Sequence, residues 1–240
     1  MVAASALTAA AFVAGSNASS SPPRLTVFAA ASLTNVLPRI DSRARYSFAG
    51  SNTLAAQIQQ GLPADVFASA NVALPWQLHR QGRVTRPVVF TANRLVIVTA
   101  RGNPQHFRSA RDLGRKGVRV VMAAAGVPVG DYTRKVLARL GLSDLVGKAV
   151  SQETDVREVL AKVVLGEADA GFVYATDAKT VAGKVSLLGL PSSAQPQVLY
   201  AAAAVKSSSH LQAAKAWVKR LLTKRAQRKL RASGFLRVPR

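Results

Sequence analysis

Short apolar runs alternate with longer amphipathic segments from residue 24 to the end of the chain. The apolar runs are rich in Val, Ala, Phe and Leu, and their length is typical of buried strands. Bounded by Gly, Pro and polar residues, they read as separate elements. They predict strands near residues 24–30, 64–70, 93–100, 118–124, 169–175, 184–190 and 197–205.

The amphipathic segments between these runs carry the period of helices. In residues 155–166, for example, Val156, Leu160 and Val163 recur on one side of a helix. Alternation of strands and helices predicts an α/β fold, in which open sheets carry helices on their faces. Helices are predicted near residues 32–40, 52–61, 73–82, 130–141, 155–166 and 209–235.

The composition adds an unusual charge to this ordinary pattern. The chain has 33 Lys and Arg against 11 Asp and Glu, a net charge of +22. No acidic residue follows Asp177, so the C-terminal segment could attract nucleic acid, anionic lipid or an acidic protein surface. Its aromatics are only Trp217 and Phe235, which we interpret as core anchors. We therefore favour solvated helix faces for the basic residues.

The first residues resemble a signal peptide. Residues 2–15 are apolar but too short to span a bilayer comfortably, and the polar stretch "SNASSSPP" follows them. We expect residues 1–23 to be a leader that is cleaved near Ala18, and the protein to be exported to the periplasm or another extracytoplasmic space. A disordered or membrane-tethering leader is the alternative.

Few residues suggest catalysis. There are no Cys residues, which excludes disulfides, thiolate metal sites and a Cys nucleophile. His79, His106 and His210 stand far apart without metal-ligand spacing, and no nucleophile elbow or phosphate-binding loop occurs. Asp65 is a lone carboxylate beside a strand, for which we expect a structural role. We therefore expect no enzyme and no cofactor.

Small or hydroxyl residues recur where helices are predicted to begin. Helix N-termini leave backbone amides unpaired and carry a positive partial charge, so they bind anions readily. A single case means little, because a Ser at such a position can simply cap its helix. Several such termini in one cleft would bind an oxyanion through neutral donors. The positions are Ser32, Ser51, Val129, Gly130, Asp155 and Val156.

The motifs at these positions resemble one known family. "VFAAASLTNVL", "FAGSNTLAAQIQQGLPADVFASAN", "NRLVIV", "GVPVGDYTRKVLARLGL" and "TDVREVLAKVVLGEADAGFVYATDA" follow in order, and "SGF" closes the series. Together they resemble the periplasmic molybdate-binding proteins of ABC transporters, the ModA family. The resemblance covers roughly residues 25 to 236.

The resemblance implies a two-lobed type II periplasmic binding fold, each lobe a mixed sheet flanked by helices. We expect lobe 1 to comprise residues 24–93 and 204–240, and lobe 2 residues 94–203. Hinge strands are expected near "RLVIV" and "VLYAA". The lobes would close on the ligand by hinge motion.

The resemblance also implies the ligand, molybdate and with it tungstate, held by hydroxyls and backbone amides without a cationic side chain. The closed form would deliver it to the membrane permease, and the protein would be a monomer with no specific nucleic acid as partner. Asp155 and Asp177 are expected to be caps or hinge-stabilising partners. Molybdenum would be bound only as the oxyanion, and its contacts carried over to this chain are Ser32, Ser51, Val129, Val156 and Tyr174.

One segment departs from the family pattern. Only "DSRARY" separates Ile40 from Ser47, where the family has a longer helix and a following strand. Pro38 lies in what remains of the helix. We expect roughly two helical turns to be missing, which could shift Ser32 relative to Ser51.

Three alternatives stay open from the sequence. The first is a binding protein for another oxyanion, sulfate or phosphate. The second is a nucleic-acid or anionic-surface binder driven by the basic C-terminal segment. The third is a hydrolase that uses Ser32, for which the sequence offers no base within reach.

Overall fold

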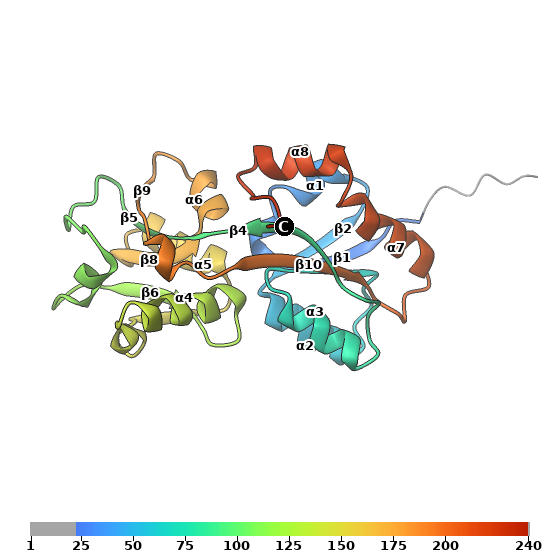
Figure 1. The fold of residues 1–240 in the computed structure, drawn as a ribbon, viewed down its shortest axis with the longest axis horizontal. Helices are drawn as coiled ribbons and strands as arrows, with labels where there is room; N and C mark the ends of the chain where they lie inside the picture. The colour runs from blue at the N-terminus through green and yellow to red at the C-terminus, as the bar shows by residue number, and fades with distance from the viewer. Residues whose placement is uncertain (1–22, 240) are drawn as a thin grey trace, which may run out of the picture.

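The computed structural model describes residues 23–239, so the leader expected at 1–23 lies almost wholly outside the described residues. Two five-stranded mixed sheets form two lobes side by side (Figure 1). This arrangement confirms the α/β, two-lobed fold class. Lobe 1 has the strand order β2-β1-β3-β10-β4, with bounds Arg45–Ala49, Thr26–Ala30, Val66–Ser69, Val198–Ala204 and Val88–Asn93. Lobe 2 has the order β7-β6-β8-β5-β9, with bounds Ser151–Glu153, Val120–Ala123, Ala170–Tyr174, Leu95–Ala100 and Val185–Leu188.

Helices cover both faces of the sheet in lobe 1, where α7 and α8 lie on one side and α2 and α3 on the other (Figure 1). In lobe 2, α4 and α6 lie on opposite sides of the strands. The helices of lobe 1 are η1 Ala31–Leu33, α1 Leu37–Ile40, α2 Ser51–Gln59, α3 Ala73–Arg80, α7 Leu211–Arg220 and α8 Lys224–Ala232. Those of lobe 2 are η2 Ala110–Gly114, α4 Pro128–Arg139, η3 Ser143–Val146, α5 Val156–Val164, α6 Ala175–Thr180 and η4 Ser192–Ala194.

The chain crosses between the lobes twice. Arg94 alone joins β4 to β5, and the segment after β9 leads back into β10. The expected limit of lobe 2 at residue 203 is wrong, because β10 pairs with β3 and β4 in the sheet of lobe 1. An apolar run buried on both faces looks the same in either lobe, so the pattern of residues 197–205 could not place it.

The shortened segment after the first helix still completes the sheet. The strand after the first helix is present: β2 pairs with β1 in parallel over five residue pairs. The helix itself is reduced to the four residues of α1, and Pro38 lies in its first turn, where no N–H bond is lost. Asp41, next in the chain, accepts a hydrogen bond from Arg220 of α7 at 2.7 Å. The C-terminal helices therefore hold the short connection in place.

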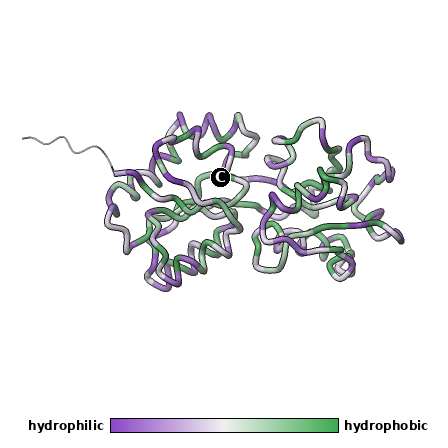
Figure 2. Tube along the Cα trace, turned by 180° about the vertical axis from the view of Figure 1, so that it is seen from behind, coloured by the Kyte–Doolittle hydropathy of each residue, from purple (hydrophilic) through white to green (hydrophobic). Residues whose placement is uncertain are grey.

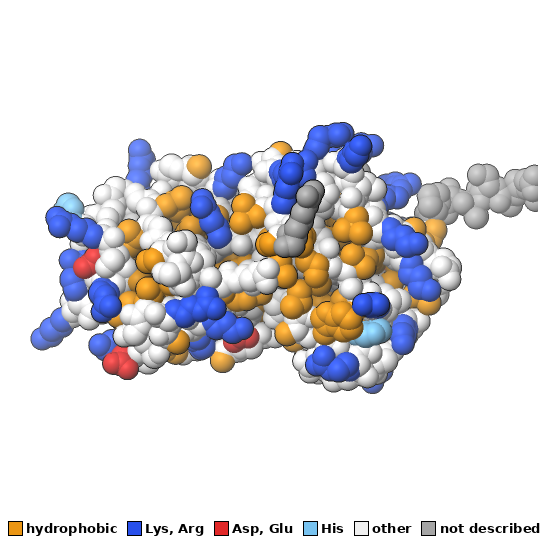
Figure 3. Space-filling view, in the orientation of Figure 1, with side chains coloured by type: hydrophobic (Ala, Val, Ile, Leu, Met, Phe, Trp, Pro, Cys, Tyr) orange, Lys and Arg blue, Asp and Glu red, His pale blue; other side chains and the backbone are white. Residues whose placement is uncertain are grey.

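The basic C-terminal helices pack as ordinary amphipathic helices. Trp217, Leu230 and Phe235 are buried, which confirms the two aromatics as core anchors. In Figure 2 the hydrophobic residues gather on the strands inside both lobes, and hydrophilic residues follow the outer helices. Lys and Arg far outnumber Asp and Glu on the face shown in Figure 3. Within residues 23–239, no helix combines the length and apolarity that a membrane crossing requires.

Asp65 has the structural role expected for it. It is buried directly before β3, where its Oδ2 accepts the backbone N–H of Thr26 at 2.6 Å. Its Oδ1 accepts the hydroxyl of Ser208, from the loop that precedes α7. One carboxylate thus joins the start of β1 to the C-terminal helices.

We expect Asp65→Ala to lower the free energy of unfolding by about 2 kcal/mol, because it leaves a buried N–H and a hydroxyl without their charged acceptor. Urea unfolding followed by circular dichroism measures the change. Asp144→Ala, at an exposed carboxylate of η3, is the matched control. Equal stability of the two variants would contradict a structural role.

Candidate functional site

A cavity lies between the two lobes, at the ends of strands where helices begin. The volume of the cavity, including the part that is open to solvent, is about 210 Å³. Both lobes contribute to it, so neither lobe alone forms the cavity. The lining residues are Ala30, Ala31, Ser32, Ala49, Gly50, Ser51 and Ala70 from lobe 1, and Val127, Pro128, Val129, Asp155, Val156 and Tyr174 from lobe 2.

Five helices start at this cavity: η1 and α2 from lobe 1, and α4, α5 and α6 from lobe 2. The residues before η1, α2 and α4 are Ala30, Gly50 and Val127, and none of them caps its helix with a side chain. First-turn amides have no acceptor inside their own helix. Because these helix ends are also positive ends of peptide dipoles, the cavity favours a negative ligand without any charged side chain.

Ser32 and Ser51 supply hydroxyls from lobe 1. Both are almost completely buried. The Oγ of Ser51 accepts the backbone N–H of Ala70 at 3.1 Å, and the Oγ of Ser32 lies 2.9 Å from the hydroxyl of Tyr200. An oxygen that already accepts one hydrogen bond keeps its own proton for another acceptor.

Tyr174 supplies a hydroxyl from lobe 2, at the end of β8 and immediately before α6. Its side chain is buried, and its Oη finds no hydrogen-bond partner among the described residues. Burial raises the pKa of the Tyr174 phenol well above its usual value, so the group stays protonated. A buried donor without an acceptor is costly, which points to a ligand oxygen as its missing partner.

Val129 and Val156 line the cavity in the first turns of α4 and α5. Their side chains are buried in the core of lobe 2. The turn at Val129 packs tightly against the end of β6, where a Cβ added to Gly130 would clash with the Ala124 carbonyl oxygen.

Of the two carboxylates near the cavity, only Asp155 is among its lining residues. Asp155 caps α5, where its Oδ1 accepts the backbone N–H groups of Arg157 and Glu158 at 2.6 and 3.2 Å. Asp177 is fully buried and forms an ion pair with Nε of Arg157 at 3.0 Å. Burial raises the pKa of Asp177 to about 7, and the Arg157 guanidinium opposes that shift. The expected capping role of Asp155 is confirmed.

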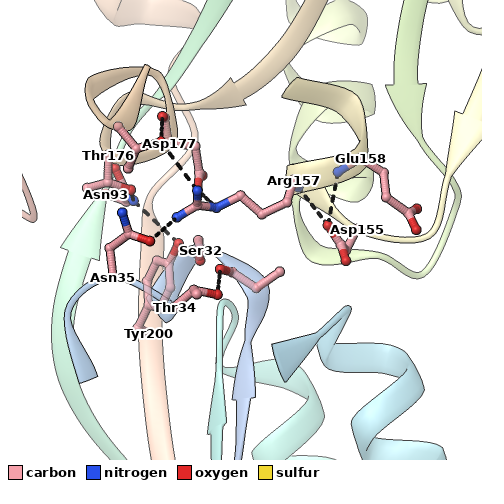
Figure 4. A network of polar contacts seen from close by, with 12 residues as sticks. Ser32, Thr34, Asn35, Asn93, Asp155, Arg157, Glu158, Thr176, Asp177 and Tyr200 are labelled. Atoms are coloured by element: carbon pink, nitrogen blue, oxygen red, sulfur yellow. Dashed lines mark hydrogen bonds and ion pairs between the residues drawn. The ribbon is translucent and has the colours of Figure 1, made fainter. Parts of the chain in front are cut away.

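Contacts around the cavity join the lobes. Arg157 of α5 donates to the side-chain oxygen of Asn35 in lobe 1 at 3.2 Å (Figure 4). Gly50 of lobe 1 approaches Thr154 of lobe 2 so closely that an added Cβ would lie 2.4 Å from its carbonyl oxygen. These contacts hold the two lobes against each other around the cavity.

The structure brings together all five residues carried over from the family motifs. Ser32, Ser51, Val129, Val156 and Tyr174 line the one cavity. Ser32 and Ser51 lie in the same cavity although the segment after the first helix is short. The described residues contain no cluster of His, Cys, Asp and Glu that could hold a metal ion.

Three residues of the site were missed by sequence reasoning. Gly50 gives the close approach between lobes, and Asn93 and Tyr200 lie behind Ser32. The available signals were weak: a Gly before a helix, an Asn at the end of an apolar run, and a single Tyr in the Ala-rich stretch "VLYAAAA".

The sequence and the fold are both similar to those of known solute-binding proteins. Residues 25–236 match the family described as bacterial extracellular solute-binding proteins. The molybdate-binding protein ModA of Mycobacterium tuberculosis is 38% identical over 92% of this chain and 90% of its own, and that of Escherichia coli is 31% identical over 83% and 84%. The periplasmic molybdate-binding protein of Azotobacter vinelandii superposes with a TM-score of 0.80 at 23% identity, over 90% of this chain and 100% of its own.

A cavity between two lobes that are joined by crossing strands is the arrangement of a two-lobed solute-binding protein. The chain belongs to the ModA family of bacterial extracellular solute-binding proteins. This membership confirms the expectations of a binding protein that is not an enzyme and of binding without a cofactor. The hydroxyl of Ser32 accordingly faces a tyrosine rather than a catalytic base.

We expect Gly50→Ala to hinder closure, because the new Cβ would meet the Thr154 carbonyl across the lobes. The backbone of Gly50, at φ −57°, accepts Ala without strain, so the lobes should keep their thermal stability. Small-angle X-ray scattering with and without molybdate measures compaction. Gly189→Ala, with open space around its Cβ, is the control. Full compaction of Gly50→Ala would contradict the proposed contact.

Proposed function

We propose that this protein binds molybdate, and tungstate as a close analogue, as the solute-binding component of an ABC transporter. The observation that carries the proposal is the convergence of five donor positions from both lobes on one cavity, whose described lining contains no Lys or Arg. The molybdate-binding function named for the relatives in M. tuberculosis and E. coli supports the same ligand.

The donor set favours a fully deprotonated tetrahedral anion. Each oxygen of such an anion can only accept hydrogen bonds, and Ser32, Ser51 and Tyr174 together with the amides of Val129 and Val156 can only donate to it. Hydrogen phosphate carries a proton that needs an acceptor, for which the two amides offer nothing and the hydroxyls only their remaining lone pairs. Sulfate meets the same requirement as molybdate, so its exclusion depends on the size of the cavity.

Transport adds three further steps to the proposal. Residues 1–23 would direct export, and the protein would work outside the cytoplasm as a monomer. The lobes would close on the anion about the crossing strands near Arg94 and β10. The closed form, with Arg157 bonded to Asn35 across the lobes, would dock on the permease.

The basic-surface alternative gains no support from the structure. Binding of single-stranded nucleic acid uses exposed aromatics as stacking platforms beside the basic residues. Trp217 and Phe235 are buried instead. The basic residues of α7 and α8 therefore lack a neighbouring exposed Trp217 or Phe235 on which a base could stack.

We expect molybdate and tungstate to raise the melting temperature of the protein, since both bind only the folded protein.

Ser51→Ala removes one donor to a charged ligand and should weaken molybdate binding about tenfold to a hundredfold. Titration calorimetry with molybdate, tungstate, sulfate and phosphate gives the affinities. Ser207→Ala, at an exposed serine before α7, is the control. A response to sulfate or phosphate with none to molybdate would refute the proposed ligand.

We expect the charge of +22 to govern how fast the anion arrives rather than how tightly it is held. Raising the ionic strength from about 0.01 M to about 1 M should lower the association rate about tenfold or more. The dissociation rate should change little, because the bound anion contacts neutral groups. Stopped-flow measurements separate the two rates. A salt effect confined to dissociation would contradict this division.

A further inference from the structure

A chain of buried side chains lies directly behind Ser32 (Figure 4). The hydroxyl of Ser32 is 2.9 Å from Oη of Tyr200, and that Oη is 3.3 Å from Nδ2 of Asn93. All three residues are at most 4% exposed. Asn93 is the last residue of β4 and Tyr200 lies in β10. This series of hydrogen-bonded side chains therefore leads from the crossing strands to the cavity.

One backbone group sets the direction of every hydrogen bond in this chain. The N–H of Arg94 can only donate, and it lies 2.9 Å from Oδ1 of Asn93. Oδ1 is therefore the acceptor end of the amide, and Nδ2 is the donor end. The two protons of Nδ2 point to Oγ1 of Thr176, at 2.8 Å, and to Oη of Tyr200.

The hydroxyl proton of Tyr200 then has a single acceptor among the contacts of Oη. Burial raises the pKa of the Tyr200 phenol well above its usual value, so the hydroxyl stays protonated. Because Oη already accepts from Asn93, its own proton points to Oγ of Ser32. Ser32 thus accepts from Tyr200, and its proton is left for the cavity.

Ser51 reaches the same state by a simpler route. Its Oγ accepts the backbone N–H of Ala70, which can only donate. Both serine hydroxyls therefore have one lone pair occupied within the protein and their proton free for the ligand. At Ser51 the backbone imposes this polarity, whereas at Ser32 it depends on two side chains.

We infer that Asn93 and Tyr200 are positioning residues that direct the proton of the Ser32 hydroxyl toward the ligand. They thereby discriminate against oxyanions that carry a proton. The inference rests on the proposed function, since it concerns the same anion site. Neither residue lines the cavity, so both act through Ser32 rather than on the ligand.

The experiment measures affinities for molybdate and for inorganic phosphate in four proteins: wild type, Tyr200→Phe, Ser32→Ala and the double variant. Tyr200→Phe keeps the buried ring and removes only the hydroxyl. Molybdate affinity is measured by titration calorimetry, and phosphate affinity by competition against bound molybdate. Tyr46→Phe is the control, because the Tyr46 hydroxyl bonds the Leu37 and Asp41 carbonyls of lobe 1, outside the site.

Tyr200→Phe should weaken molybdate binding about fivefold to tenfold in the wild-type background and have little effect in the Ser32→Ala background. It should also lower the ratio of phosphate to molybdate dissociation constants, because a Ser32 hydroxyl without its Tyr200 partner is free to rotate and accept the phosphate proton. Tyr46→Phe should change neither. Asn93→Ala should move the same ratio in the same direction, which provides a second route if Tyr200→Phe is unstable.

Equal effects of Tyr200→Phe with and without the Ser32 hydroxyl would overturn the inference, as would an unchanged or increased ratio. If the wild-type protein binds molybdate and either of these two results is found, only the positioning role is refuted. A wild-type protein that binds no molybdate refutes the proposed function itself.

Discussion

The structure depends on backbone amides that the fold itself leaves unpaired. Five helices begin at the cavity between the lobes, and the residues before η1, α2 and α4 offer no side-chain cap. In most helices such a cap or water satisfies the first turn. Here the small residues Ala30 and Gly50 keep the space clear. In the proposed function an anion satisfies amides of both lobes at once, and closure and recognition become the same event.

The basic residues of this protein and the residues that line its cavity lie in different parts of the molecule. The Lys and Arg residues lie on the outside, as Figure 3 shows for one face, while the described lining of the cavity is neutral except for the capping carboxylate of Asp155. Arg157, the cation next to the site, has its guanidinium engaged by Asp177 and Asn35. A cation inside the cavity would attract any anion of suitable size. Neutral donors with fixed directions respond instead to the shape and protonation of the ligand.

The sequence predicted the parts of the site that belong to local motifs. Ser32, Ser51, Val129, Val156 and Tyr174 each stand at a strand–helix junction, so pattern and family resemblance together found them. Other features depend on pairing across long stretches of chain, which a local pattern does not encode. Tyr200 meets Ser32 across 168 positions, β10 could not be assigned to a lobe, and β2 went unseen because its sequence "RYSFA" lacks a continuous apolar run.

The single residue between β4 and β5 bears on the strength of binding. In the proposed function each lobe carries half of the anion site, and Arg94 alone separates β4 of lobe 1 from β5 of lobe 2. A tether this short keeps the second half at high effective concentration once the first has captured the anion. Contacts that would be weak on either lobe alone can therefore add up to tight retention, at a small entropic cost for bringing the halves together.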